Sequence, residues 1–219
     1  MPTQKPTVLV IRHGETQWNR QERLQGRLDT PLTTTGFQQA QAVGAFHRAR
    51  ITEAPHVVFW VSPLGRAKQT ASVLSDVWQV PYDDFQIVPD LAERSYGQWE
   101  GLSRQDIRQE YGTELDESSR NPWGFAMKGG ESRAELDARL ANWMDSLQPG
   151  PLHVAVTHSG CLRALRGLRT NDPLGVRLTY QEPQTTSILL EEFGVSVLDV
   201  PQSILEAAGC WGTGRTVWI

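Results

Sequence analysis

The amino-acid sequence predicts an α/β protein built on a mainly parallel sheet. Three short apolar runs that are rich in β-branched residues, at 8–11, 57–61 and 152–157, are typical of buried strands. Between them, apolar residues recur every three or four positions, which is the spacing of helices. Strands that alternate with helices favour a parallel sheet covered by helices. The length of 219 residues suits one domain with a buried core.

Two helices are expected on either side of the strand at 57–61. Thr35 and Gln38 have the spacing of a capping box, which predicts a helix start at Thr35. Pro63 suits the first turn of a helix, so it is expected to begin the second one. The apolar positions of these two helices are Phe37, Ala40, Val43, Phe46, Leu64, Ala67, Ala71, Leu74 and Trp78.

The second half of the chain predicts two more helices and a hairpin. Ser132 and Glu135 form another capping box, which opens a helix with one apolar face. A helix over about 161–168 follows the strand at 152–157. Residues 187–190 and 195–200 are expected to pair as a hairpin. The apolar face of the capped helix consists of Leu136, Leu140, Trp143, Met144 and Leu147.

Residues 92–130, approximately, fit the alternating pattern less well. This stretch is rich in glycine, and only residues 103–111 favour a helix. We interpret it as a small irregular cap inserted over one end of the sheet, within a single domain that spans residues 1–219. Residues 209–219, which are rich in glycine and tryptophan, remain unassigned.

Charge and composition restrict the classes of partner. The net charge is −4 and the sequence pI is about 5.7, so the chain has no general attraction for nucleic acid or for anionic membranes, and neither is expected as a partner. Cys161 and Cys210 are too few for a disulfide framework or a four-thiolate zinc site. The N-terminal apolar run at 8–11 is too short for a signal peptide or a membrane span. A cytoplasmic location is therefore expected.

Two histidines and two arginines follow the predicted strands. Arg12 and His13 come directly after the run at 8–11, and His158 comes after the run at 152–157. Arg66 lies shortly after the strand at 57–61. Ligands of open α/β sheets bind beyond the carboxyl ends of the strands, so these four side chains are expected to face one crevice.

This set of side chains suits a phosphoryl group. Arginine forks match phosphate oxygens, and fixed cations stabilise the charge of a phosphoryl group in transfer. Neighbouring arginines would lower the pKa of His13 and keep its imidazole neutral and nucleophilic. The leaving alkoxide needs a proton from an acid, although spacing alone does not select one of the acidic residues. A cationic crevice does not suit Mg²⁺, which prefers clustered carboxylates, so no metal is expected.

The sequence motifs resemble those of the histidine phosphatase superfamily, also called the phosphoglycerate mutase-like family. The match includes Arg-His-Gly-Glu-Thr at 12–16, Ser-Pro-Leu at 62–64, Gly-Glu-Ser at 130–132 and Thr-His-Ser-Gly at 157–160. These motifs occur in the order that the family shows, and the resemblance extends over about residues 8–190. Further matching blocks lie at 26–33, 36–40, 66–71 and 93–101.

The resemblance implies a fold and a role for particular residues. The fold is a three-layer α/β/α sandwich. His13 resembles the phosphorylated nucleophile, and Glu93 resembles the proton donor. Arg12, Arg66 and His158 resemble the phosphate pocket. No metal or cofactor is implied, and relatives are often dimers, so a homodimer remains open. The positions that line the substrate pocket in relatives are Thr16, Asn19, Gly26, Tyr96, Ser159 and Gly160.

Departures from the mutase pattern favour hydrolysis of a small phosphomonoester metabolite. Bisphosphoglycerate-dependent mutases carry a longer segment with an adjacent pair of arginines, whereas this chain has no such pair near Arg133. They also carry Asn-Lys where this chain has Ser103 and Arg104. Residues 93–97 and 162–165 nevertheless look mutase-like, so a phosphoglycerate mutase is the alternative. The resemblance does not name the substrate.

A third reading is an inactive module that binds phosphate and regulates a partner. The presence of all five implied pocket residues argues against it. Among other cations, Arg163 and Arg166 are expected to cover a helix surface, and Arg104 is either a substrate contact or an exposed charge. Packing and substrate contact both remain open for Trp99 and Trp123 in the cap.

Overall fold

The protein is built on one mixed sheet of six strands, as the computed structural model shows for residues 4–180 and 182–210. The strand order is β3-β2-β4-β1-β5-β6. The first four of these strands run parallel, whereas β5 and β6 are antiparallel to their neighbours. The predicted strands and the C-terminal hairpin are confirmed, and the short edge strand β3 was not predicted. The strands are β1 (Thr7–Arg12), β2 (Val57–Val61), β3 (Phe85–Ile87), β4 (Leu152–Thr157), β5 (Thr186–Glu191) and β6 (Gly194–Asp199).

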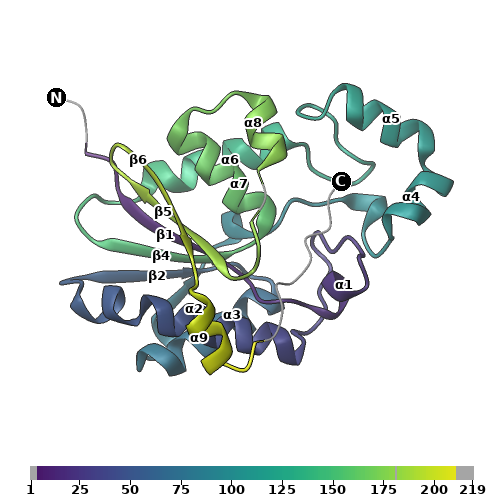
Figure 1. Cartoon of the computed structure of the whole chain (residues 1–219). Coiled ribbons are helices and arrows are strands. Elements are labelled where there is room, and N and C mark those ends of the chain that lie inside the picture. The colour runs from purple at the N-terminus through teal and green to yellow at the C-terminus, as the bar shows by residue number, and fades with distance from the viewer. Residues whose placement is uncertain (1–3, 181, 211–219) are drawn as a thin grey trace.

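Helices cover both faces of the sheet, which confirms the three-layer sandwich (Figure 1). One layer consists of α2 (Thr34–Glu53), α3 (Gly65–Trp78) and α9 (Gln202–Ala207). The opposite layer consists of α6 (Arg133–Ser146), α7 (Ser159–Thr170) and α8 (Leu174–Thr179). Among the described residues, no helix is long and apolar enough to cross a membrane.

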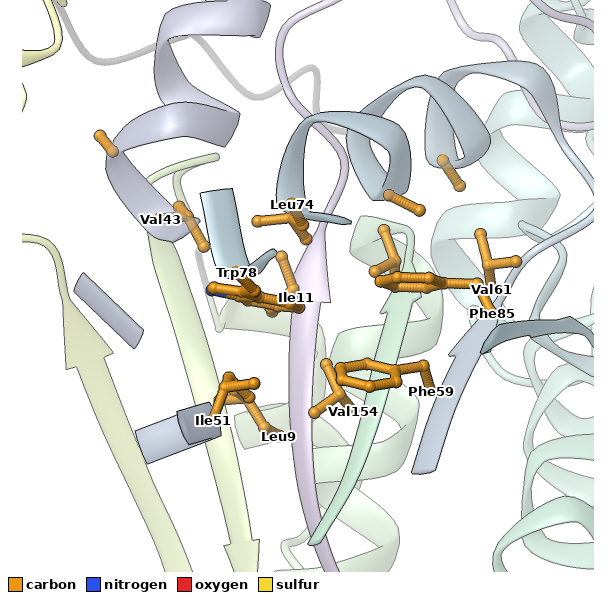
Figure 2. Close-up of a cluster of buried hydrophobic side chains, with 14 of the residues drawn as sticks. Leu9, Ile11, Val43, Ile51, Phe59, Val61, Leu74, Trp78, Phe85 and Val154 are labelled. Carbon is orange, nitrogen blue, oxygen red and sulfur yellow. The ribbon is translucent and has the colours of Figure 1, made fainter. Parts of the chain in front are cut away.

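The alternation of side chains along β1 supplies both halves of the core. Leu9 and Ile11 point to the layer of α2 and α3, where Leu74 and Trp78 pack over them (Figure 2). Val8 and Val10 point to the layer of α6 and α7. All four β1 side chains are buried, and each contributes about 1.5–3 kcal/mol of hydrophobic stabilisation. The strand that ends at the predicted histidine is therefore rigidly held on both faces.

Two predicted helix starts were wrong by two residues. The N-cap of α2 is Thr33, whose Oγ1 accepts a hydrogen bond from the Gly36 amide at 3.0 Å. Thr35 therefore lies inside the helix and does not cap it. Likewise, α3 begins at Gly65 rather than at Pro63. The capping box of Ser132 and Glu135 at the start of α6 is confirmed.

The cap is more regular than the sequence predicted. It contains α4 (Arg104–Glu110) and also α5 (Gly112–Arg120), which the glycine content had obscured. Gly112 occupies the first position of α5 and does not interrupt it. The cap has its own apolar cluster of Leu24, Trp99, Ile107, Leu115 and Met127. Trp99 is fully buried there, which assigns it to packing.

Shorter helices complete the fold. α1 (Gln17–Arg20) follows β1, and α8 packs beside α7. Among the described residues, single-turn 3₁₀ helices lie between α3 and β3 (Tyr82–Asp84), directly after β3 (Pro89–Leu91) and before α4 in the cap (Gly97–Trp99). Residues 211–219 of the unassigned C-terminal end lie outside the described part of the chain.

Candidate active site

The predicted histidines and arginines meet where the parallel strands end. His13 follows β1 directly, and its amide donates to the Thr157 carbonyl at 3.0 Å, which extends the pairing of β1 with β4. His158 follows β4, and its ring centroid lies 5.1 Å from that of His13. Arg66, in the first turn of α3, places Nε 3.2 Å from Nε2 of His13. Arg12, His13 and Arg66 line one cavity, as expected, whereas His158 packs against His13 and does not line it.

A cavity of about 430 Å³ opens above His13. Eight of the eleven predicted site residues line it. The three others lie nearby: His158 packs against His13, Thr16 caps α1, and Gly160 lies against Glu93. The predicted residues that line the cavity are Arg12, His13, Asn19, Gly26, Arg66, Glu93, Tyr96 and Ser159.

His13 is held as a neutral imidazole. Its Nδ1 lies 2.8 Å from the Gly14 carbonyl, which accepts a hydrogen bond only if Nδ1 carries the proton. The lone pair is then on Nε2, next to Arg66. Burial, followed by the positive charges of Arg66 and Arg12, holds the pKa of His13 well below its ordinary value of 6.5. The imidazole is therefore unprotonated at neutral pH, as the sequence predicted.

His158 is held at one ring nitrogen by Ser62. The hydroxyl of Ser62 lies 2.7 Å from its Nε2 and accepts from the Leu64 amide at 3.3 Å. Burial and the charge of Arg66 lower the pKa of His158 well below 6.5, so the ring is neutral. The other ring nitrogen, Nδ1, has no hydrogen-bond partner among the described residues, and it carries the ring proton when Ser62 donates to Nε2.

Arg66 is fixed by backbone and side-chain acceptors on the loop before it. Its Nη1 donates to the Leu28 carbonyl and to Oδ1 of Asp29, both at 2.8 Å, and its Nη2 donates to the Gly26 carbonyl at 2.8 Å. The side chain is 1% exposed, so this ion pair is weakly screened on the arginine side. These contacts pre-orient the guanidinium before any substrate arrives.

Arg12 and Glu93 complete the pocket from opposite sides. Nη1 of Arg12 donates to the Glu182 carbonyl at 2.6 Å. The Glu93 carboxylate accepts from the amides of Arg94 at 2.8 Å and of Gly160 at 3.0 Å. A Cβ atom at position 160 would lie 2.3 Å from Oε1 of Glu93, so any side chain there would displace this carboxylate.

Sequence reasoning missed two residues of the site. Arg163 lines the cavity and donates to Oγ of Ser159 at 3.1 Å, so the expectation that it covers a helix surface was wrong. Its position four residues after Ser159, on the same face of α7, was a signal that could have indicated this. Glu182 is buried, accepts from Ser159, and lies 3.6 Å from Nε of Arg163. No motif pointed to Glu182.

The donor set of the pocket is cationic and imidazole-based. Across residues 4–180 and 182–210, no group of three His, Cys, Asp or Glu side chains has an arrangement that could hold a metal ion. Instead, guanidinium and imidazole groups surround the Nε2 atom of His13. Such a set can bind a phosphate dianion and accept its phosphoryl group on nitrogen.

The layered fold and this pocket define an α/β protein with a cationic cavity at the carboxyl ends of its parallel strands. The chain belongs to the histidine phosphatase superfamily (branch 1), whose family model matches residues 8–194. The family resemblance of the motifs is thereby confirmed.

Curated relatives carry mutase names. The chain is 34% identical over 213 residues to the "Probable phosphoglycerate mutase GpmB" of Salmonella paratyphi C, with coverage of 89% of this chain and 95% of the relative. It is 31% identical over 166 residues to the "2,3-bisphosphoglycerate-dependent phosphoglycerate mutase" of Mesorhizobium japonicum, which covers 73% of this chain and 79% of the relative.

Similar solved structures include one with a phosphatase name. A "putative alpha-ribazole-5'-P phosphatase" from Escherichia coli superposes with a TM-score of 0.74 at 25% identity, covering 90% of this chain and 97% of the other. YhfR of Bacillus stearothermophilus gives a TM-score of 0.73 at 28% identity, covering 89% and 96%. Members with phosphatase names and members with mutase names therefore share this fold.

Proposed function

We propose that the protein is a phosphatase that hydrolyses a small phosphomonoester through a phosphohistidine on His13. One observation carries the proposal: Nε2 of a buried, neutral His13 accepts a hydrogen bond from Nε of Arg66, and both residues line one cavity together with Arg12. Among the described residues, the ring nitrogens of this imidazole bond to the Gly14 carbonyl and to Arg66, not to a carboxylate. The neighbouring guanidinium groups favour binding of a dianion in the cavity.

In the first step, Nε2 of His13 attacks phosphorus. The N–P bond forms as the bond from phosphorus to the ester oxygen breaks, and that oxygen takes a proton from Glu93. Arg12, Arg66 and Nδ1–H of His158 stabilise the charge on the three phosphoryl oxygens. The products of this step are the free alcohol, phosphohistidine and the Glu93 carboxylate.

In the second step, water attacks the phosphohistidine. The Glu93 carboxylate accepts a proton from that water as its oxygen bonds to phosphorus, and the N–P bond breaks. Inorganic phosphate leaves, and His13 and Glu93 return to their starting states. The amides of Arg94 and Gly160 hold the same carboxylate in place for both proton transfers.

Chemical trapping of the intermediate tests the proposal. We expect hydrolysis of an aryl phosphate without added metal and in the presence of a chelator. Rapid quenching should capture a phosphoryl label on the protein that is labile in acid and stable in base. His13→Ala should lose both the label and the turnover. Full activity of His13→Ala would overturn the mechanism.

A phosphoglycerate mutase is the second candidate, because the curated relatives named above carry that activity in their names. A mutase returns the phosphoryl group of His13 to the bound product, whereas a phosphatase gives it to water. A coupled assay with and without bisphosphoglycerate separates the two reactions. We expect release of inorganic phosphate and no requirement for the primer.

An inactive phosphate-binding module is the least supported alternative. It would bind inorganic phosphate and turn over none of the phosphomonoesters in a broad panel. The placement of Arg12, His13, Arg66 and Glu93 around one cavity supports an active enzyme instead.

A further inference from the structure

The segment that carries Glu93 is held in an unusual way. Residues 92–96 lie between the 3₁₀ helices Pro89–Leu91 and Gly97–Trp99 and belong to neither a helix nor a strand. Regular secondary structure therefore does not fix the backbone of the proposed acid. A general acid must nevertheless lie within hydrogen-bond reach of the oxygen that it protonates, and a small displacement lowers the rate. Contacts with other parts of the fold must supply the missing rigidity.

Four consecutive carbonyl groups of this segment accept hydrogen bonds from side chains. The donors belong to α6, β4, α7 and the loop that follows α1. They are Nη1 of Arg139 for the Asp90 carbonyl, Oγ1 of Thr157 for the Leu91 carbonyl at 2.7 Å, Sγ of Cys161 for the Ala92 carbonyl at 3.0 Å, and Nε of Arg27 for the Glu93 carbonyl at 3.0 Å. The backbone at Glu93 is thus located from several directions at once.

One carboxylate joins the two arginines of this set. Oε1 of Glu131 accepts from Nε of Arg139 at 2.6 Å, and Oε2 accepts from Nη2 of the same guanidinium at 2.9 Å, which is a bidentate pair. Oε2 also lies 3.7 Å from Nη2 of Arg27. The Glu131 and Arg139 side chains are only 14% and 16% exposed, so water screens their attraction weakly. Glu131 therefore orients both guanidiniums that hold the carbonyls of Asp90 and Glu93.

The start of α6 supports this carboxylate. Glu131 directly precedes Ser132, the N-cap of α6, and its amide donates to the Ser95 carbonyl at 2.9 Å. Arg139 lies in the same helix, whose apolar side chains are buried in the core. The ion pair is therefore mounted on a rigid element, and it transmits the position of α6 to the segment that carries Glu93.

The network lies behind the site and not within it. The described lining of the phosphate pocket does not include Glu131, Arg139 or Arg27. At its other end, the Glu93 carboxylate accepts from the amides of Arg94 and Gly160. Those two hydrogen bonds form only if the backbone of Glu93 is in place, so the clamp at the carbonyl and the cradle at the carboxylate depend on each other.

From these contacts we propose that Glu131 is a positioning residue for the general acid: by holding Arg139 and Arg27 against the carbonyls of Asp90 and Glu93, it keeps the Glu93 carboxyl group where the leaving oxygen needs its proton. The inference rests on the proposed function and adds to it a residue that does not touch the substrate. The Gly-Glu-Ser motif at 130–132 thereby gains a role in catalysis besides the capping of α6 by Ser132.

The dependence of kcat/KM on the leaving group tests this role. Glu131→Gln keeps the size of the side chain but removes its charge. We expect kcat/KM to fall about 30-fold for an alkyl phosphate, whose leaving oxygen needs the proton, and less than about threefold for nitrophenyl phosphate. A purely structural role would lower both values equally. The ratio of the two values does not depend on the fraction of enzyme that is folded, so a destabilised variant still gives an answer.

Further variants assign the effect to the ion pair. Arg139→Gln should change the ratio as Glu131→Gln does, and Arg139→Lys should restore only part of it, because an ammonium group cannot form the bidentate pair. The double variant should be no worse than either single variant, since both act through one segment. Glu53→Gln removes an acid from an exposed position on α2 and should keep the wild-type ratio.

Amide hydrogen exchange measured by NMR gives a readout that needs no turnover. The amides of Arg94 and Gly160 report on the Glu93 carboxylate, because both donate to it. In Glu131→Gln, we expect both to exchange at least about tenfold faster than in the wild type. Amides in β1 should keep their wild-type rates, which shows that the sheet is intact.

Two results would overturn the inference: a wild-type ratio of kcat/KM values in Glu131→Gln, or wild-type exchange at Arg94 and Gly160 in that variant. Release of phosphate from both esters with an unchanged ratio would uphold the phosphatase and refute the role of Glu131. If the wild type releases phosphate from no ester, the proposed function fails, and the exchange rates alone decide whether Glu131 holds Glu93 in place.

Discussion

The phosphate pocket and a second cavity both collect arginines, but they hold them differently. In the pocket, Arg66 has fixed acceptors in Gly26, Leu28 and Asp29, and its Nε donates to His13. In this second cavity of about 410 Å³, which α6, α7, α8 and the cap form and which we call the outer cavity, the Arg94 guanidinium rests on the Tyr96 ring. The structure therefore fixes one arginine by several hydrogen-bond acceptors and holds the other against an aromatic ring.

The two regions also come from different parts of the fold. Strand ends and the first turn of α3 build the phosphate pocket, whereas α6, α7, α8 and the cap build the outer cavity. Changes in the pocket should therefore affect all phosphomonoesters equally. Changes in the outer cavity should affect substrates according to the part that lies beyond the phosphoryl group.

The largest effect is expected for Arg66→Ala. Because this side chain contacts His13 and faces the transferred group, kcat/KM should fall on the order of 1,000-fold for two substrates that differ only beyond the phosphoryl group. Steady-state kinetics on one matched pair of substrates measures both losses. Arg48→Ala serves as the control for removal of a charge. A loss confined to one of the two substrates would contradict the division between the two regions.

Gly160→Ala should reduce turnover about 100-fold for alkyl phosphates, because the new methyl group collides with the Glu93 carboxylate at 2.3 Å. Nitrophenyl phosphate, whose leaving group needs little help from an acid, should lose much less. Gly112→Ala is the matched control, since nothing lies within 4 Å of a Cβ atom there. Equal losses for both leaving groups would argue against Glu93 as the acid.

Glu182→Gln tests the connection between the two regions. The substitution preserves the carbonyl that receives Arg12 but removes the carboxylate charge beside Ser159 and Arg163. We expect kcat/KM to fall about tenfold, with most of the change in KM, because the arginine that borders both cavities loses its orientation. A Ser159→Ala variant should show a similar KM change. An unchanged KM in Glu182→Gln would show that this carboxylate does not position the site.

The smallest expected effect is on how the free energy of unfolding depends on pH. The pKa of His13 is held well below 6.5, so the unfolded chain binds a proton near pH 6.5 that the folded chain does not. The stability that follows from this difference is fully present above that pH and is lost as the pH falls below it. Between pH 7 and pH 5.5, the loss amounts to about 1 kcal/mol.

Urea denaturation of His13→Gln at these two pH values measures that contribution. The variant should lose about 1 kcal/mol less stability on acidification than the wild type. His56→Gln, at an exposed position, controls for the substitution itself. Identical acid sensitivity of His13→Gln and the wild type would show that His13 is already protonated in the folded protein.

The sequence predicted the parts of the molecule that local patterns determine. The strands at β1, β2 and β4 are continuous apolar runs, and the groups that follow them were expected to meet because parallel strands end at one edge. The capping box at Ser132 is a short-range hydrogen-bond pattern, so it was predicted correctly. The cap predicted at Thr35 was wrong, because the hydroxyl that accepts from the Gly36 amide is that of Thr33.

The parts that long-range packing determines could not be predicted. Arg94 and Arg133 are far apart in the sequence, and spacing alone does not predict that they line the same cavity. Glu182 precedes β5 without any motif, yet its carbonyl receives Arg12 from the opposite end of the chain. The glycines of the cap suggested irregular structure, whereas the apolar cluster around Trp99 stabilises two helices there.

The position of β1 in the sheet has a consequence for synthesis of the protein. This strand is made first, yet both of its neighbours, β4 and β5, begin only at Leu152 and Thr186. Until those segments leave the ribosome, His13 has no sheet to hold it, and Arg12 lacks the carbonyl that orients it. The site around His13 therefore cannot take its folded arrangement before residues 152–191 have been synthesised.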